Sequence, residues 1–397
     1  MAHSPTPSRS LPRPPTESDF HSPLHDDRVV ARIGSWLGLC LSVCFLTGLI
    51  SHYQQHPLDW LAVGPNPAWG YRVTQGLHII TGTAMLPLLL AKLYTAYPRL
   101  FAPPVRSLVF LLEKGSIAVL IASTSFQLIT GLMNVAQWYP WGFGFTKAHH
   151  ALAWVAFGSL LIHIAVKLPI IRRTLRAPLA DGVELPERFG ADPDGTTRRG
   201  FLRAVGLVTG GIALLTAGQT VYPLRRLALL APRRPDVGPQ GLPVNRTAAA
   251  AGVTTEVTGS SWRLELIGPA GSRFLSLADL AGRPQQQADL AIACVEGWSA
   301  QASWSGIALR DLVRLAGGDA RSAVRVESLE QHGGYRVTTL PADFANDART
   351  LLATRLNGET LHLDHGYPAR LIAPDRPGVL QTKWVRSLTM ITEEADQ

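Results

Sequence analysis

The hydrophobic pattern divides the chain into two regions. Residues 29–230 contain long apolar runs, whereas residues 236–397 alternate shorter apolar stretches with regularly spaced charges. Four runs approach the roughly 20 residues that a helix needs to cross a bilayer, and a fifth is weaker and rich in Gly and Ala. We expect these helices at about 29–51, 73–94, 107–133, 148–168 and 204–230.

Composition and charge support a membrane protein. A mean hydropathy of +0.12 with 17% charged residues is too apolar for an ordinary soluble chain of 397 residues. The net charge of +8 comes from Arg and Lys that flank the apolar runs. Because this placement fits the positive-inside bias, the sequence indicates a lipid bilayer as partner and no nucleic acid.

The basic flanks also predict an orientation. Arg and Lys gather before the first run, between the second and third, and after the fourth, while the connections 52–72 and 134–147 hold only Arg72 and Lys147. This alternation places the amino terminus in the cytoplasm. The fifth helix then leads outward, so everything after residue 231 is expected outside the cytoplasmic membrane.

A motif before the fifth run gives a second indication. Residues 197–206 read TRRGFLRAVG, which resembles the twin-arginine signal for proteins exported in the folded state. The resemblance implies the twin-arginine export machinery as a partner. A plain positive-inside flank is the alternative interpretation.

These patterns predict a multidomain chain: an all-α transmembrane bundle of four helices plus a fifth anchor helix, then an α+β domain. The expected segments are a disordered tail, the four-helix bundle, a cytoplasmic linker with the twin-arginine-like motif, the fifth helix with its linker, and an oxidoreductase domain. Their boundaries are 1–27, 28–168, 169–203, 204–235 and 236–397.

Histidines inside the apolar helices predict a haem. A histidine within a membrane helix is costly and indicates a function. His78 and His149 fall at similar depth near the outer face on separate helices, as bis-histidine ligation of a b-type haem requires. His150, next in the chain, is the alternative to His149.

A second haem is left open. His163 lies 14 residues after His149, close to four helical turns, and therefore on the same helix face. The matching position on the second helix, 14 residues after His78, is Lys92. One haem b is expected. His163 either ligates a second haem with an unidentified partner, contacts a quinone, or is a satisfied polar residue.

The region after residue 253 reads as short strands and turns around a lone cysteine. An apolar strand ends at Cys294, a Gly-Trp turn follows, and a helix is expected at about 307–315. The cysteine should therefore lie at the end of a buried strand, beside a pocket.

This segment carries a specific resemblance. The stretch CVEGWS followed by WSGIALRDLV resembles the sulfite-oxidase superfamily of molybdopterin oxidoreductases, which includes the periplasmic methionine sulfoxide reductases. In that family this cysteine ligates molybdenum, which implies the same role for Cys294. A soft thiolate suits such a metal.

Further blocks extend the resemblance over about 237–391. Residues 356–391 are similar to the cofactor-clamping segment, and PVNRTAA and GGYRVTTLP resemble stretches that reach the active site. The resemblance implies cofactor contacts from Asn245, His365, Arg370 and Lys383, with Tyr335 and Arg246 in the catalytic pocket. Ser328 and Arg336 are further pocket candidates.

The combined reading is a bacterial, multi-pass inner-membrane enzyme with its molybdopterin domain in the periplasm. It would transfer an oxygen atom to or from a small substrate and exchange electrons with membrane quinone through haem b. Two alternatives stay open: a cofactor-less relay or binding module, and a sulfite-type dehydrogenase instead of a sulfoxide-type reductase. The latter needs a compact cationic pocket, to which Arg246 and Arg336 are candidates.

Overall fold

The computed structural model describes residues 16, 19–58, 60–61, 63–101, 108–176 and 195–391. Most of the expected tail 1–27 and of the expected linker 169–203 therefore lies outside the described residues. The Cα positions group into two compact units, and the boundary between the units crosses every one of the five long helices. We describe each unit by itself.

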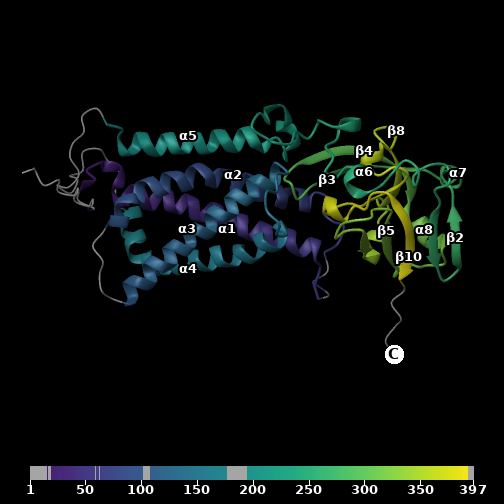
Figure 1. Cartoon of the computed structure of the whole chain (residues 1–397), viewed down its shortest axis with the longest axis horizontal. Helices are drawn as coiled ribbons and strands as arrows, with labels where there is room; N and C mark the ends of the chain where they lie inside the picture. Colours follow the sequence, from purple (N-terminus) through teal and green to yellow (C-terminus); the bar gives the residue numbers. More distant parts are fainter. Residues whose placement is uncertain are drawn as a thin grey trace, which may run out of the picture. The chain divides into compact units, whose positions relative to one another are not determined.

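The amino-terminal region is helical. Its long helices are α1 (Asp27–Gln55), α2 (Gly70–Ala96), α3 (Leu108–Val135), α4 (Phe145–Arg176) and α5 (Arg198–Ala217), as Figure 1 shows. By length and composition, these five helices of the described part are each able to cross a membrane. The expectation of a helical amino-terminal region with several long apolar helices is thus confirmed.

Two helices, α4 and α5, differ from expectation at both ends. Helix α4 begins at Phe145 and continues through Pro169 to Arg176, so it is longer than the expected 148–168. Helix α5 begins inside the TRRGFLRAVG motif because Thr197 caps it: the Gly200 amide donates to Thr197 Oγ1 at 3.1 Å. It ends at Ala217 instead of residue 230, and Pro223 then stands in a short 3-10 segment where an α-helix cannot continue.

The first unit holds one half of each long helix, joined by apolar packing and one buried ion pair. Val29, Ile33, Leu88 and Leu202 are buried together in its core. Nearby, Arg198 Nη1 lies 3.0 Å from Asp26 Oδ2, with both side chains buried. Within the stretch expected as a tail, residues 23–25 form a 3-10 turn whose Leu24 is buried.

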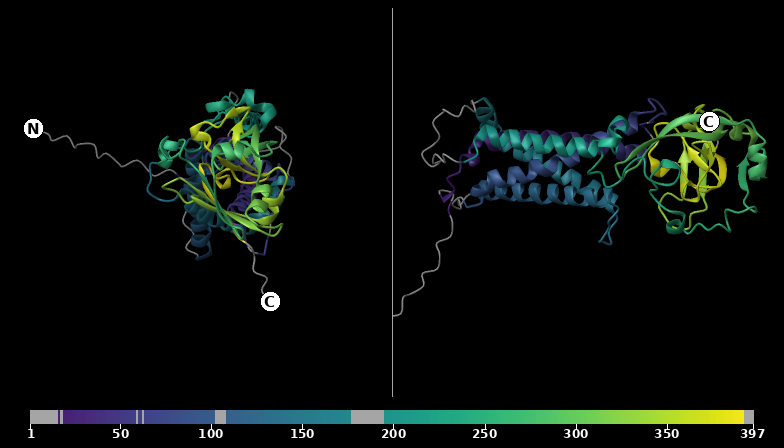
Figure 2. Two further views of the ribbon diagram at one scale, coloured as in Figure 1. Left: turned by 90° about the vertical axis from the view of Figure 1, so that its right-hand side faces the viewer. Right: turned by 90° about the horizontal axis from the view of Figure 1, so that it is seen from above.

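The second unit holds the other helix halves and a sheet domain. One sheet has the order β2-β1-β10-β5-β6 and the other β3-β4-β7-β8, with β9 also on β7. Only β1 and β10 pair in parallel among the described strands of the first sheet. Figure 2 shows both sheets in yellow and green. The strands are β1 (Leu264–Gly268), β2 (Gly271–Leu275), β3 (Gln286–Ala293), β4 (Ser299–Ala308), β5 (Ala323–Ser328), β6 (Val337–Leu340), β7 (Leu351–Leu356), β8 (Glu359–Thr360), β9 (Arg370–Ile372) and β10 (Val385–Ile391).

Two apolar cores hold this α+β domain together. The larger lies among β1, β5, β10 and the helices α8 (Leu309–Leu315) and α9 (Ala342–Asn346). The other gathers the inward residues of the second sheet around the fully buried Trp304. Strand β3 alternates buried and exposed positions until its last two residues, both buried. The chain therefore enters the buried interior of the sheet domain at Cys294.

Candidate active site

Cys294 sits at the head of a tight turn between β3 and β4. The Cys294 amide donates to the Trp298 carbonyl at 2.9 Å, and the Gly297 amide donates to the Cys294 carbonyl at 3.0 Å. The turn requires φ of +91° at Gly297, a conformation that glycine adopts without steric cost. The cysteine lies at the end of a buried strand as expected, and it is 1% exposed.

The turn also carries a buried carboxyl group. Glu296 Oε2 accepts a hydrogen bond from Trp298 Nε1 at 3.1 Å, and the residue is 7% exposed. Burial raises the pKa of the Glu296 carboxyl. Burial, followed by the charge of Glu296, raises the pKa of the Cys294 thiol. The apolar surroundings therefore favour the neutral thiol unless a cation binds it.

Two cations are buried close to each other in the same domain. Arg370 opens β9 and Lys383 precedes β10, and Gly366 lies between them with φ of +112°. A Cβ on Gly366 would meet the Lys383 Cα at 3.1 Å and the Arg370 Cβ at 3.2 Å. Only a glycine therefore lets these two backbones approach so closely.

Neither cation is paired with a carboxylate in the described part of the chain. Arg370 Nη1 donates to the His365 carbonyl at 3.2 Å, and its buried Nε has no partner among the described residues. Lys383 Nζ donates to the carbonyls of Asp364, at 3.0 Å, and Arg246. Burial lowers the pKa of Arg370 to about 9 and that of Lys383 to about 7. Two buried positive groups that lack a salt-bridge partner among the described residues indicate a site for an anion.

Other expected site residues hold this arrangement in place. Ser328 Oγ donates to the Lys383 carbonyl at 2.7 Å, so the serine fixes the backbone of the lysine. His365 Nε2 donates to the Pro239 carbonyl at 2.7 Å, which leaves Nδ1 for any other partner. Burial and the neighbouring Arg370 lower the pKa of His365 to about 4, so the ring is neutral at pH 7.

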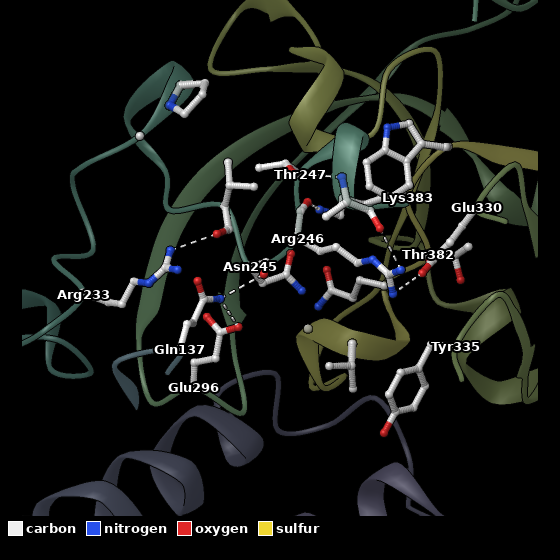
Figure 3. A pocket seen from close by; sticks show the side chains of 18 of the residues that line it. Gln137, Arg233, Asn245, Arg246, Thr247, Glu296, Glu330, Tyr335, Thr382 and Lys383 are labelled. Carbon is white, nitrogen blue, oxygen red and sulfur yellow. Dashed lines mark hydrogen bonds and ion pairs between the residues drawn. The ribbon is translucent and has the colours of Figure 1, made fainter. Parts of the chain in front are cut away.

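A cavity of about 850 Å³ opens over this region (Figure 3). The expected residues Asn245, Arg246, Tyr335 and Lys383 line it. Cys294, Ser328, His365 and Arg370 do not, and all four are buried. Glu296, two residues after the cysteine, connects the buried turn to the cavity.

Several lining residues were not anticipated from the sequence. Gln137, Tyr139, Arg233, Glu296 and Glu330 all contribute to the wall. Glu296 lies inside the CVEGWS motif and could have been chosen on that ground. Gln137 and Tyr139 follow helix α3, far from any motif, and no sequence pattern marks them.

The cavity wall carries three basic residues, Arg233, Arg246 and Lys383, and two carboxyl groups, Glu296 and Glu330. Arg246 forms an ion pair with Glu330, and its Nη2 also donates to the Ala250 carbonyl at 3.1 Å. Arg336, the other candidate for a cationic pocket, is mostly exposed and lies 3.3 Å from Glu327 instead. Arg336 therefore does not contribute to the cavity wall.

In the helical part of the second unit, two candidate haem ligands face each other. The ring centroids of His78 and His149 are 6.2 Å apart. His78 Nδ1 donates to the Cys44 carbonyl at 2.8 Å, and its Nε2 lies 3.9 Å from Cys44 Sγ; His149 Nδ1 is buried without a partner among the described residues. His150 instead stacks on His52 at 3.8 Å.

His163 belongs to the first unit, apart from this pair. In that unit Lys92 Nζ donates to the Val30 carbonyl at 2.9 Å. The lysine at the position where a second ligand was sought is thus engaged with the backbone of α1.

Comparison with known proteins agrees with the sheet domain. Residues 251–397 match the family described as oxidoreductase molybdopterin binding domain. The carboxy-terminal part of the chain is therefore a molybdopterin-binding oxidoreductase domain, as the sequence motifs predicted.

Individual relatives are named as oxidoreductases or as a subunit of one. A putative protein-methionine-sulfoxide reductase subunit YedZ1 of Azospira oryzae is 29% identical over 139 residues, 34% of this chain and 50% of that protein. Sulfite oxidase of Arabidopsis thaliana is 33% identical over 25% of this chain and 30% of that protein. The uncharacterized oxidoreductase YuiH of Bacillus subtilis is 29% identical over 34% of this chain and 67% of that protein. The chain thus spans half or less of the length of the first two.

Proposed function

We propose that this chain is a membrane-bound molybdenum-cofactor oxidoreductase that transfers an oxygen atom to or from a small neutral substrate outside the membrane. The observation that carries the proposal is the pair of buried, carboxylate-free cations, Arg370 and Lys383, in the same domain as a buried Cys294. These two residues would bind a pterin phosphate, which would supply the missing negative charge, and Cys294 would bind a high-valent metal as a thiolate.

The residues fit the cofactor in distinct roles. Cys294 would ligate molybdenum, Arg370 would fork onto the phosphate through its free Nε, and Lys383 would add a point charge. Asn245 and His365 Nδ1 would contact the pterin, and Ser328 would position Lys383 through its carbonyl. Bound there, the cofactor supplies two-electron oxygen-atom transfer.

The side chains that line the cavity then determine which substrates bind there. Tyr335 and Arg246 lie in its wall as candidate substrate contacts, and the Glu296 carboxyl stands between the cavity and Cys294. An anion such as sulfite would meet this carboxyl as well as Arg233 and Lys383 in the wall, while the guanidinium of Arg246 is already paired with Glu330. A neutral sulfoxide meets no such repulsion, and a sulfoxide-type substrate also agrees with the name of the Azospira relative.

We further propose that His78 and His149 hold one haem b. Bis-histidine ligation needs two imidazole rings that face each other from separate helices, and the two ring centroids here are 6.2 Å apart. This arrangement supports the assignment, as does the unpartnered His149 Nδ1. Gly48 and Gly131 lie against the two rings, where larger side chains would crowd them. The haem would exchange electrons with membrane quinone, and a second haem at His163 is not needed.

The proposed location is the cytoplasmic membrane, with five spanning helices and the segment boundaries given above. The sheet domain would be exported through the twin-arginine pathway. Arg198 also pairs with Asp26 in the folded protein, so its structural and export roles need separating. Replacing Arg198 and Arg199 with Lys keeps both charges, and should leave the sheet domain inaccessible to protease in spheroplasts. Accessible domain in that variant would show that the arginines serve only as a basic flank.

The test of function uses the full chain in detergent. Metal analysis should give about one molybdenum per chain, and the reduced-minus-oxidised spectrum should show a b-type haem. Dimethyl sulfoxide should turn over and sulfite should not. The Cys294→Ser variant should lose turnover and keep the haem spectrum. Haem without molybdenum in the wild type would reduce the sheet domain to a binding module, and turnover of sulfite alone would establish the dehydrogenase alternative.

A further inference from the structure

The turn after helix α3 forms part of the active-site cavity. Gln137 and Tyr139 line the cavity although they belong to the helical region of the sequence (Figure 3). They lie in the same compact unit as the sheet domain. We name residues 134–139 the α3 turn.

The backbone of the α3 turn favours glycine at the position of Gln137. The Trp138 amide donates to the Met133 carbonyl at 2.9 Å, and the Gln137 amide donates to the Asn134 carbonyl at 3.0 Å. This is the Schellman arrangement that ends many helices, and it places Gln137 at φ of +54°. Glycine is the usual residue there because a side chain disfavours this conformation. A glutamine at such a position suggests a role for its side chain.

The side chain of Gln137 joins two walls of the cavity. Its Nε2 donates to Glu296 Oε1 and, at 2.9 Å, to the Asn245 carbonyl. Both partners are acceptors, so the amide nitrogen faces them. Glu296 is thereby held at both oxygens, because Trp298 Nε1 occupies the other one.

The rest of the α3 turn is attached to the cysteine turn. Asn134 Nδ2 donates to the Val295 carbonyl at 3.1 Å, and Tyr139 Oη donates to Asn134 Oδ1 at 2.9 Å. The α3 turn therefore contacts the residues on both sides of the peptide that joins Val295 to Glu296. Fixing these residues fixes where the Glu296 carboxyl points.

We propose that Gln137 is a positioning residue that sets the orientation of Glu296 in the cavity and thereby the affinity for neutral substrate. The inference rests on the proposed function and deepens it, because it makes the helical region a necessary part of the substrate site. Without Gln137 only Trp298 Nε1 holds the Glu296 carboxyl, and the released oxygen turns into the cavity, where it competes for the space and the polar contacts of the substrate.

The test compares Gln137→Gly with a matched control in the full-length enzyme. Gln137→Gly removes the amide and suits the backbone, so the thermal midpoint and molybdenum content should not fall. The KM for dimethyl sulfoxide should rise about tenfold with kcat nearly unchanged, as expected for losing one charge-assisted contact. Gln137→Asn should give an intermediate KM. The control is Asn357→Gly, another non-glycine residue with positive φ, at 49°, which does not line the cavity; its KM should match the wild type.

A second readout requires no cofactor. In chain made without molybdenum cofactor, amide hydrogen exchange of the 294–298 peptide should be faster in Gln137→Gly and unchanged in Asn357→Gly. An unchanged exchange rate or an unchanged KM would overturn the inference, as would a KM change that follows a loss of molybdenum or of thermal stability. If the wild type neither binds molybdenum nor turns over, the proposed function fails. Faster exchange would then still establish the positioning role of Gln137.

Discussion

The carboxylate of Asp375 accepts a hydrogen bond from the backbone amide of Tyr71, in the first turn of helix α2. The first amides of a helix lack partners within it, and its amino terminus favours negative charge. A loop of the sheet domain thus caps a helix more than 300 residues earlier in the chain. Gly70 leaves room for the cap, because a Cβ there would lie 3.0 Å from Asp375 Oδ1.

Removing this cap should destabilise the second unit. Asp375 has φ of +50°, so Asp375→Gly deletes the carboxylate without adding backbone strain. We expect the free energy of unfolding in detergent to fall by about 1 kcal/mol, the usual cost of a lost cap. Asp375→Asn keeps an acceptor and should recover most of it. The exposed Asp289 provides a control, since Asp289→Ala should have little effect. Equal thermal midpoints for Asp375→Gly and wild type would show that the contact contributes nothing.

Gly366 should be essential for retaining the cofactor. A methyl group there faces the Lys383 Cα at 3.1 Å and also meets an unfavourable φ of +112°. Gly366→Ala should therefore cost about 1–3 kcal/mol and separate Lys383 from Arg370. Molybdenum content measured by mass spectrometry should fall while the haem spectrum persists. Gly358→Ala, at φ of +84° with open space around it, separates the backbone effect from the crowding. Full molybdenum content in Gly366→Ala would contradict the anion site assigned to these two cations.

The stability of chain lacking the cofactor should increase with pH above neutrality because of Lys383. Burial lowers its pKa from 10.5 to about 7 in the folded chain. Between these values the unfolded chain binds one proton more than the folded chain, so the free energy of unfolding rises with pH, by at most about 1.4 kcal/mol per unit. Below pH 7 both states are protonated and the full cost of burying the charge is felt.

Thermal unfolding between pH 7 and 9.5 would measure this slope. Lys383→Met should flatten it and should raise stability most at the lower pH. The exposed Lys147 serves as the control, and Lys147→Met should keep the wild-type slope. A Lys383→Met variant with the same slope as wild type would show that this lysine is not the group that titrates.

The proposed haem ligands can be tested by comparing three single histidine variants. His78→Ala and His149→Ala should each abolish the b-type absorbance, because each removes one axial ligand. His150→Ala should keep it, since that ring stacks on His52. Molybdenum content should stay near wild type in all three. A spectrum lost in His150→Ala and kept in His149→Ala would exchange the two assignments.

The sequence predicted the elements and missed the contacts between them. Cys294 was correctly expected at the end of a strand because the apolar run and the Gly-Trp turn are both local signals. The five apolar helices were likewise visible, although the cap at Thr197 and the continuation of α4 through Pro169 shifted their ends. The type and approximate position of a helix or strand depend on residues that are close in the chain, so the local hydrophobic pattern predicts them.

The site residues show which contacts the local sequence pattern did not predict. Arg246 and Arg336 were both candidates for a cationic pocket, yet one lines the cavity and the other is exposed beside Glu327. Gln137 carried no signal at all, because its importance depends on Glu296, which is 159 positions away. Such pairings depend on how the chain folds back on itself, and a single sequence does not contain them.

The helical region of the sequence and the sheet domain share hydrogen bonds at the carbonyl of Val295. It accepts from Asn134 at 3.1 Å and from Gln75 at 3.5 Å, so amides of two apolar helices occupy both lone pairs of one peptide oxygen. A fragment cut after helix α5 would expose this oxygen to water and lose the α3 turn. Such an excised domain would be a different catalyst, and kinetic constants measured on it would not describe the intact protein.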